Sequence, residues 1–147
     1  MRRAILPALL LLVLAPAALA QPTPEGLWRT FDDHTGRERG AVRIEVQDGV
    51  LTGRIVATTD PADAARRCTR CTGARKDAPI IGLAIITNMH RDGDHWDGGQ
   101  ILDPENGDVY RCNLRLIDGG DRLVVRGFLG ISLFGRSQTW VRDRPGA

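Results

Sequence analysis

Alternation of apolar and polar side chains recurs along this chain and constrains its fold more than any other feature. The alternation has a period of two in residues 42–47, 51–58 and 110–117. Successive side chains of a β-strand point to opposite faces, so this pattern is typical of strands with one buried face. No segment has a convincing helical stripe. The sequence therefore predicts an all-β domain.

Turn signals separate the alternating segments. Asp48-Gly49, Asp92-Gly93, Asn106-Gly107 and Gly119-Gly120 each lie between apolar runs, and such residues accept the positive φ of tight hairpins. We expect about eight antiparallel strands, near residues 26–32, 41–47, 50–58, 80–89, 95–102, 108–117, 122–130 and 136–143.

Eight sequential antiparallel strands favour one architecture. They close into an up-and-down β-barrel, which leaves no exposed sheet edge. A two-sheet sandwich is the alternative, but it usually needs long crossover connections, and only residues 59–79 are long enough to provide one. We favour the barrel.

The first twenty residues have the three parts of a secretory signal peptide. Residues 1–3 are basic at Arg2 and Arg3, residues 4–14 are apolar apart from Pro7, and Ala18-Leu19-Ala20 provides the small residues of a cleavage site. A membrane anchor is the alternative, but the apolar stretch is short for a span. We expect cleavage before Gln21 and an exported protein, periplasmic or secreted, that is soluble and does not span a membrane.

Removal of this leader changes the charge balance. The chain has 20 Lys and Arg residues against 18 Asp and Glu residues, and Arg2 and Arg3 lie in the leader, so 18 of each sign remain. Broad attraction to nucleic acid or to anionic membranes is not expected of such a chain. The 147 residues less the leader leave 127, residues 21–147, enough for a single domain with one core.

Residues at the two ends of the predicted barrel suggest how it closes. Trp28 opens the first strand within Gly26-Leu27-Trp28, while Trp140 and Arg142 lie in the last. First and last strands pair in a barrel, so Trp28 and Arg142 are placed for a cation–π contact. A Gly-x-Trp opening with a late arginine is similar to the lipocalin-like (calycin) barrels.

A longer series of segments resembles one family of small exported bacterial proteins, domain-of-unknown-function family 2147. The segments are GLWRTFDDHTG, CTRCTG, APIIGL, GGQILDPENGDVYRC and VRGFLGISLFGRSQTWVR, which run in order from Gly26 to about Arg142. The resemblance implies a compact β-domain of the exported compartment. It implies no established activity and provides no catalytic residue to carry over.

Three cysteines bear on redox or metal chemistry. Cys68-Thr69-Arg70-Cys71 has thioredoxin-like spacing, but the helix that would lower a thiol pKa is not expected. A zinc site would combine the three cysteines with one histidine, and the second half of a paired ligand motif is absent. We expect a Cys68–Cys71 disulfide that braces a loop and a buried free thiol at Cys112. A bond from either cysteine to Cys112 is the alternative.

Acidic residues provide no clear metal or catalytic site. The stretch from Asp92 to Asp108 fails as a calcium-binding EF-hand loop, because Trp96 and Asp97 occupy the fifth and sixth positions. Asp32-Asp33 is better read as part of a turn than as a catalytic pair. We expect no catalytic constellation, no metal and no cofactor.

The long loop after the third strand is locally basic. Its cations are Arg66, Arg67, Arg70, Arg75 and Lys76. A solvated surface loop is the simplest interpretation. A more specific interpretation is that these five residues form a lid at the barrel mouth, suited to binding a carboxylate or phosphate headgroup.

Two apolar segments and the barrel lead to three functional hypotheses. Residues 80–86 are apolar on both faces, and residues 128–135 combine bulky side chains, including Leu133 and Phe134, with glycines. We favour a lipocalin-like binding protein for an apolar or amphipathic small molecule. The alternatives are a structural or interaction protein of the cell envelope that docks a partner, and an enzyme of thiol–disulfide chemistry at Cys68 and Cys71.

Overall fold

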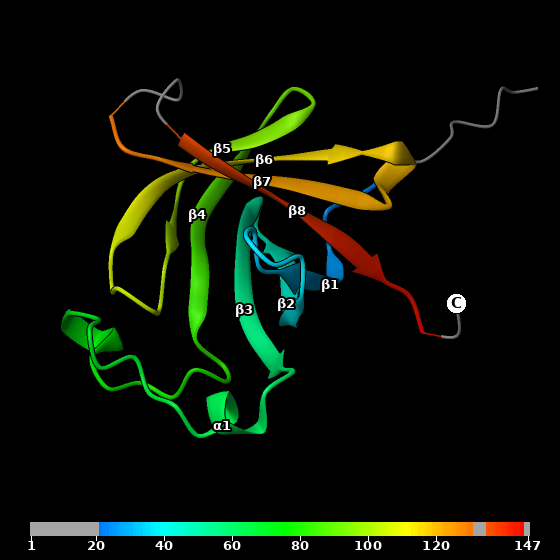
Figure 1. Ribbon diagram of the computed structural model, residues 1–147. Helices are drawn as coiled ribbons and strands as arrows, with labels where there is room; N and C mark the ends of the chain where they lie inside the picture. Colours follow the sequence, from blue (N-terminus) through cyan, green and yellow to red (C-terminus); the bar gives the residue numbers. More distant parts are fainter. Residues whose placement is uncertain (1–20, 131–134, 146–147) are drawn as a thin grey trace, which may run out of the picture.

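A computed structural model describes residues 21–130 and 135–145 as a single closed barrel (Figure 1). The predicted leader, residues 1–20, lies outside the described residues, as do Leu133 and Phe134 of the predicted partner surface. The strands are β1 (Gly26–Phe31), β2 (Glu38–Gln47), β3 (Val50–Thr58), β4 (Ala84–Asp92), β5 (His95–Leu102), β6 (Val109–Ile117), β7 (Arg122–Phe128) and β8 (Gly135–Asp143).

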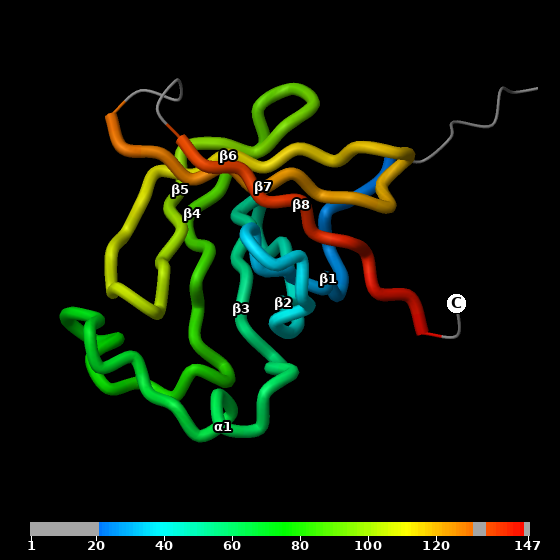
Figure 2. Tube along the Cα trace, in the orientation of Figure 1, coloured from blue at the N-terminus to red at the C-terminus, as the bar shows by residue number. Residues whose placement is uncertain are grey.

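Each strand pairs antiparallel with the next, and β8 returns to pair with β1. The predicted all-β, antiparallel up-and-down barrel is therefore confirmed, and the sandwich is excluded. The path of the chain around the barrel can be followed in Figure 2. Among the described residues, no helix is long and apolar enough to cross a membrane.

The alternating pattern has the expected structural basis. In β2, Gly40, Val42 and Ile44 are buried, whereas Arg43 and Glu45 on the opposite face are exposed. The inward side chains of all strands form one core inside the barrel. Its largest fully buried members are Trp28, Trp140, Ile44, Leu51, Ile86, Met89, Leu114 and Leu123.

The turn chemistry fixes the register of the hairpins. Asp48 and Gly49 link β2 to β3 with φ values of 52° and 78°, and positive φ at both positions is typical of the type I′ turns that suit twisted strands. Gln47 pairs with Val50 across this turn, so the side chains of both strands alternate in phase.

The segment between β3 and β4 differs from the prediction. The fourth strand begins at Ala84 rather than near residue 80, because Gly82 adopts a φ of 90° and donates its N–H to Ile55 O. Helix α1 (Pro61–Ala64) in this segment was not predicted either. Asp60 caps it by accepting the N–H of Ala62, with Pro61 in the first turn.

The two other short helices, η1 (Gly73–Arg75) and η2 (Asp118–Gly120), were also missed. Each is a single hydrogen-bonded turn, too short to show the apolar stripe by which a helix is predicted from sequence. The long connection that contains α1 and η1 runs along the lower edge of the barrel in Figure 1.

Arg142 closes the barrel where β8 meets β1. Trp28 pairs with Arg142 in the register of the two strands, and the Arg142 Cζ atom lies 4.3 Å from the Trp28 ring centroid. The guanidinium also donates to three carbonyl oxygens: Nε to Gly120 O at 2.6 Å, Nη1 to Glu25 O at 2.8 Å and Nη2 to Thr23 O at 2.6 Å. One side chain thus joins β8, the η2 turn and the segment before β1.

The N-terminal segment closes this end of the barrel. Trp28 is fully buried, and its Nε1 donates to Pro24 O at 2.8 Å. Burial lowers the pKa of Arg142 below its ordinary value. The opposite end of the barrel contains the cavity described below.

We expect Arg142→Lys to lower the free energy of unfolding by about 2–3 kcal/mol, because hydrogen bonds to a charged group contribute that much and an ammonium does not reproduce the planar stacked geometry. Arg144→Lys is the matched control, since Arg144 pairs with Asp121 on the exposed surface and such pairs contribute at most about 1 kcal/mol. Urea unfolding measures both variants. Equal losses for the two would contradict the role of Arg142 in closing the barrel.

Candidate functional site: a cavity at the open end of the barrel

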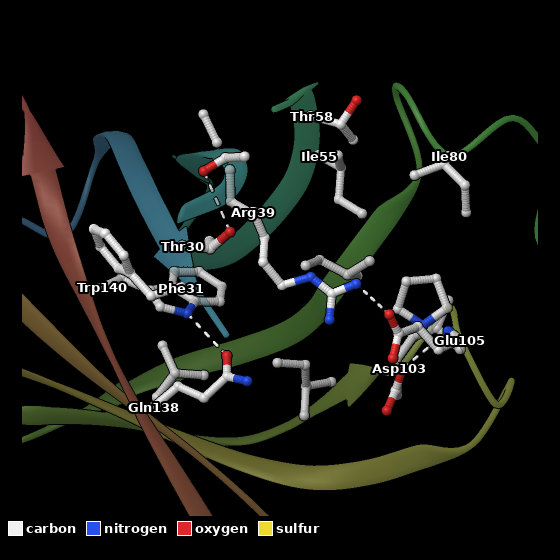
Figure 3. A pocket seen from close by; sticks show the side chains of 18 of the residues that line it. Thr30, Phe31, Arg39, Ile55, Thr58, Ile80, Asp103, Glu105, Gln138 and Trp140 are labelled. Atoms are coloured by element: carbon white, nitrogen blue, oxygen red, sulfur yellow. Dashed lines mark hydrogen bonds and ion pairs between the residues drawn. The ribbon is translucent and has the colours of Figure 1, made fainter. Parts of the chain in front are cut away.

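A cavity of about 360 Å³ lies inside the barrel at the end opposite the Trp28 seal. This volume is within the range of small-molecule sites, roughly 300–1,000 Å³. The cavity is bounded by the barrel strands, the β5–β6 connection and the loop between β3 and β4. Figure 3 shows the side chains that surround it.

The deeper wall of the cavity is apolar. Its apolar side chains come from seven strands and from the β3–β4 loop: Phe31, Val42, Ile55, Ile80, Ile85, Ile101, Leu102, Val125 and Trp140. Polar groups among them are already bonded within the chain. Thr30 Oγ1 donates to Gly40 O at 3.2 Å, and Trp140 Nε1 donates to Gln138 Oε1 at 3.1 Å. The deep wall thus suits an apolar group.

Arg39 lies across the cavity near its mouth. Its guanidinium reaches from β2 toward the β5–β6 connection, where it pairs with Glu105 (Figure 3). Asp32 lies 3.7 Å from the same guanidinium. The hydrogen bond with Glu105 is the main cause that raises the pKa of Arg39 above its ordinary value, so this group is cationic at any physiological pH.

Two further arginines line the mouth, and each has an acidic partner. Arg66 Nη1 lies 2.7 Å from Asp63 Oδ1 in the β3–β4 loop. Arg136, at the start of β8, pairs with Asp33 of the β1–β2 connection. The ion pairs of Arg39 and Arg136 thus join elements that are distant in sequence, whereas the Arg66–Asp63 pair is local to one loop.

The disulfide loop supports one wall of the cavity. Cys68 and Cys71 form a disulfide with Cα atoms 5.3 Å apart, and Cys68 Sγ lies 3.6 Å from Pro104 O. Pro104 lines the cavity. Close approach continues at Gly107, where a Cβ atom would come 2.1 Å from Arg70 O. The disulfide loop and the β5–β6 connection consequently pack as one unit, side by side in Figures 1 and 2.

The predicted basic lid is only partly placed at the mouth. Of Arg66, Arg67, Arg70, Arg75 and Lys76, Arg66 alone lines the cavity. Two of the others serve the loop itself: Arg67 Nη1 donates to Asp77 O at 2.8 Å, and Lys76 donates to Thr69 O. These cations do not face the cavity because the loop folds on itself through hydrogen bonds. The number of charges in the loop does not predict that fold.

Three residues of the mouth were not predicted from the sequence: Arg39, Arg136 and Glu105. A signal existed for Arg136, since the alternation that places Trp140 inside the barrel also places Gln138 and Arg136 inside. Arg39 lay just outside the predicted start of its strand. Glu105 belongs to the acidic stretch that was considered only as a calcium loop, and its contact with Arg39 joins positions 66 apart in sequence.

The remaining candidate residues lie in the core or in turns, outside the cavity. Cys112 is free and fully buried, and burial raises the pKa of its thiol to about 12, so it is protonated at physiological pH. Asp32 accepts N–H groups of His34 and Thr35 in a turn, and these bonds lower its pKa. Over residues 21–130 and 135–145, no group of three or more His, Cys, Asp or Glu is placed to hold a metal ion.

The fold and the cavity together define the class of the protein, a lipocalin-like barrel. A solved structure supports this class: protein HP1028 from the human pathogen Helicobacter pylori, which is described as belonging to the lipocalin family. The two structures superpose with a TM-score of 0.74 over 84% of this chain and 85% of that one. Their sequences are 13% identical, so the similarity concerns the fold.

The family follows from the sequence itself. Residues 26–142 match the family described as "Uncharacterized protein conserved in bacteria (DUF2147)". The chain belongs to this family, as the resemblance of its sequence segments predicted. Curated proteins provide no match.

We expect removal of the disulfide to loosen the cavity wall more than the barrel. In Cys68→Ala/Cys71→Ala, global stability should fall by only about 1–2 kcal/mol, because the closed loop is very short, while amide hydrogen exchange of residues 103–108 becomes faster. Hydrogen exchange followed by mass spectrometry compares the segments. Cys112→Ala is the control, with a core penalty of order 1 kcal/mol and unchanged exchange in residues 103–108. Unchanged exchange in the double variant would contradict the bracing role.

Proposed function

We propose that this protein binds a small apolar or amphipathic molecule in the cavity at the open end of its barrel. The observation that carries the proposal is the combination of an apolar deep wall with a polar mouth in one space of about 360 Å³. Sites for small molecules are commonly lined in this way, with a few polar groups that orient the ligand. The lipocalin-like fold is compatible with such a role, since an eight-stranded barrel can hold one small ligand.

A binding role accounts for the side chains better than a catalytic one. Cys68 and Cys71 are 0% and 2% exposed, whereas catalytic thiols are accessible and have a low pKa. We propose no catalytic residue. The large exposed apolar side chains of the described residues are Val56, Ile81 and Leu129.

We also propose that the protein acts outside the cytoplasm. The predicted leader motivates this proposal, and the disulfide supports it, because such bonds persist in oxidising compartments.

Substitutions on β3 test the binding proposal. Ile55 lines the cavity, whereas the neighbouring Val56 is 36% exposed on the outer face. Ile55→Trp should fill the cavity, and Val56→Trp adds the same side chain outside. The probe is N-phenyl-1-naphthylamine, an uncharged apolar dye that fluoresces on transfer from water. We expect saturable binding of one dye to the wild type and to Val56→Trp, and affinity at least about tenfold weaker for Ile55→Trp, a loss of about 1.4 kcal/mol.

Folding of both variants is checked by thermal unfolding, because overpacking costs about 1–3 kcal/mol. A folded Ile55→Trp protein that binds the dye as the wild type does would place the dye outside the cavity. That result would contradict the proposal, as would the absence of binding to the wild type.

A further inference from the structure

The arginines at the cavity mouth are already neutralised by the chain. Arg39 pairs with Glu105 and lies 3.7 Å from Asp32. The other two mouth arginines pair with Asp63 and Asp33, as described above. No mouth arginine of the described residues is therefore left without an acidic partner, and an anionic ligand would have to displace one.

Carboxylates outnumber guanidinium groups around this mouth. Three arginines and three acids line it, and Asp32 and Asp33 add two acids in contact with those arginines. The acids that line the cavity are Asp63, Asp103 and Glu105. Asp103 accepts the backbone N–H of Glu105 at 2.9 Å, and within the described part of the chain it forms no ion pair. Asp103 lies beside Glu105 in Figure 3, and both residues line the cavity.

We propose that the mouth selects ligands by charge: the cavity takes an apolar body with a cationic end, such as an amine, in preference to the same body with a carboxylate. This inference rests on the proposed binding function and names its ligand class. It replaces the carboxylate or phosphate headgroup that the basic loop suggested.

The expected preference for a cationic end follows from the ion pairs that each headgroup would break or form at the mouth. An entering carboxylate that pairs with Arg39 leaves Glu105 unpaired beside a second anion, and like charges at close range repel. An entering ammonium breaks no ion pair, because Asp103 is available to it. The apolar body packs against the deep wall of the cavity in both cases, so the difference in affinity depends on the headgroup. Salt weakens this difference, since the mouth is open to solvent.

Three ligands of equal chain length test the inference: decylamine, decanol and decanoate. Each displaces N-phenyl-1-naphthylamine from the wild-type protein at pH 7 and low ionic strength. We expect decylamine to bind roughly tenfold more tightly than decanoate, with decanol between them, and a ratio that shrinks in 0.5 M NaCl.

Asp103→Asn tests the assigned residue. The amide oxygen keeps the acceptor for the Glu105 N–H but removes the charge, so we expect the preference for decylamine over decanoate to fall roughly two- to fivefold. Asp48→Asn is the matched control, because Asp48 lies in the β2–β3 turn, away from the cavity residues, and asparagine tolerates its positive φ. This control should keep the wild-type preference.

Tighter binding of decanoate than of decylamine would overturn the inference and leave the binding function intact. Equal binding of the three ligands, or an unchanged preference in Asp103→Asn, would also overturn it. A wild-type protein that binds neither the dye nor any of the three ligands would instead contradict the proposed function.

Discussion

The contact between Arg142 and Trp28 is the interaction on which the rest of this structure depends. A sheet of eight strands leaves two edges unless its first and last strands pair, and here only three residue pairs join β1 to β8. The Arg142 guanidinium adds a stacking contact and three hydrogen bonds to carbonyl oxygens at that short seam. The same contacts hold the segment before β1 over one end of the barrel.

Closure at one end leaves the other end free to form a site. The Trp28 end is filled by large side chains, whereas the opposite end keeps a cavity whose wall includes two loops. Glu105 of the β5–β6 connection pairs with Arg39, and the disulfide loop packs against the same connection. Arg136 pairs with Asp33 of the β1–β2 connection. Exposed ion pairs contribute little to stability, about 0–1 kcal/mol each. On the proposed function, their position across the mouth matters more for what enters the cavity than for folding.

Local sequence patterns were sufficient for the fold and insufficient for the site. The period of two, the Asp48-Gly49 turn and the Gly-x-Trp opening are local or paired signals, and each has a direct structural counterpart in the barrel. The mouth depends on contacts such as Arg39 with Glu105, which join residues far apart in sequence and which no periodicity encodes. The basic charge of the β3–β4 loop predicted a lid of five cations, of which only Arg66 lines the cavity. The backbone fold of the loop determines which cation faces the cavity, and the charge alone does not encode that fold.

The central claim is that the cavity holds a small molecule. Native mass spectrometry of the full chain, expressed with its leader and purified without detergent from the exported fraction, tests this claim most directly. The account predicts a species heavier than the polypeptide by one small ligand, which dissociates on collisional activation and is absent from the Ile55→Trp variant. A wild-type protein with the polypeptide mass alone, unchanged after incubation with decylamine, decanol or decanoate, would contradict it.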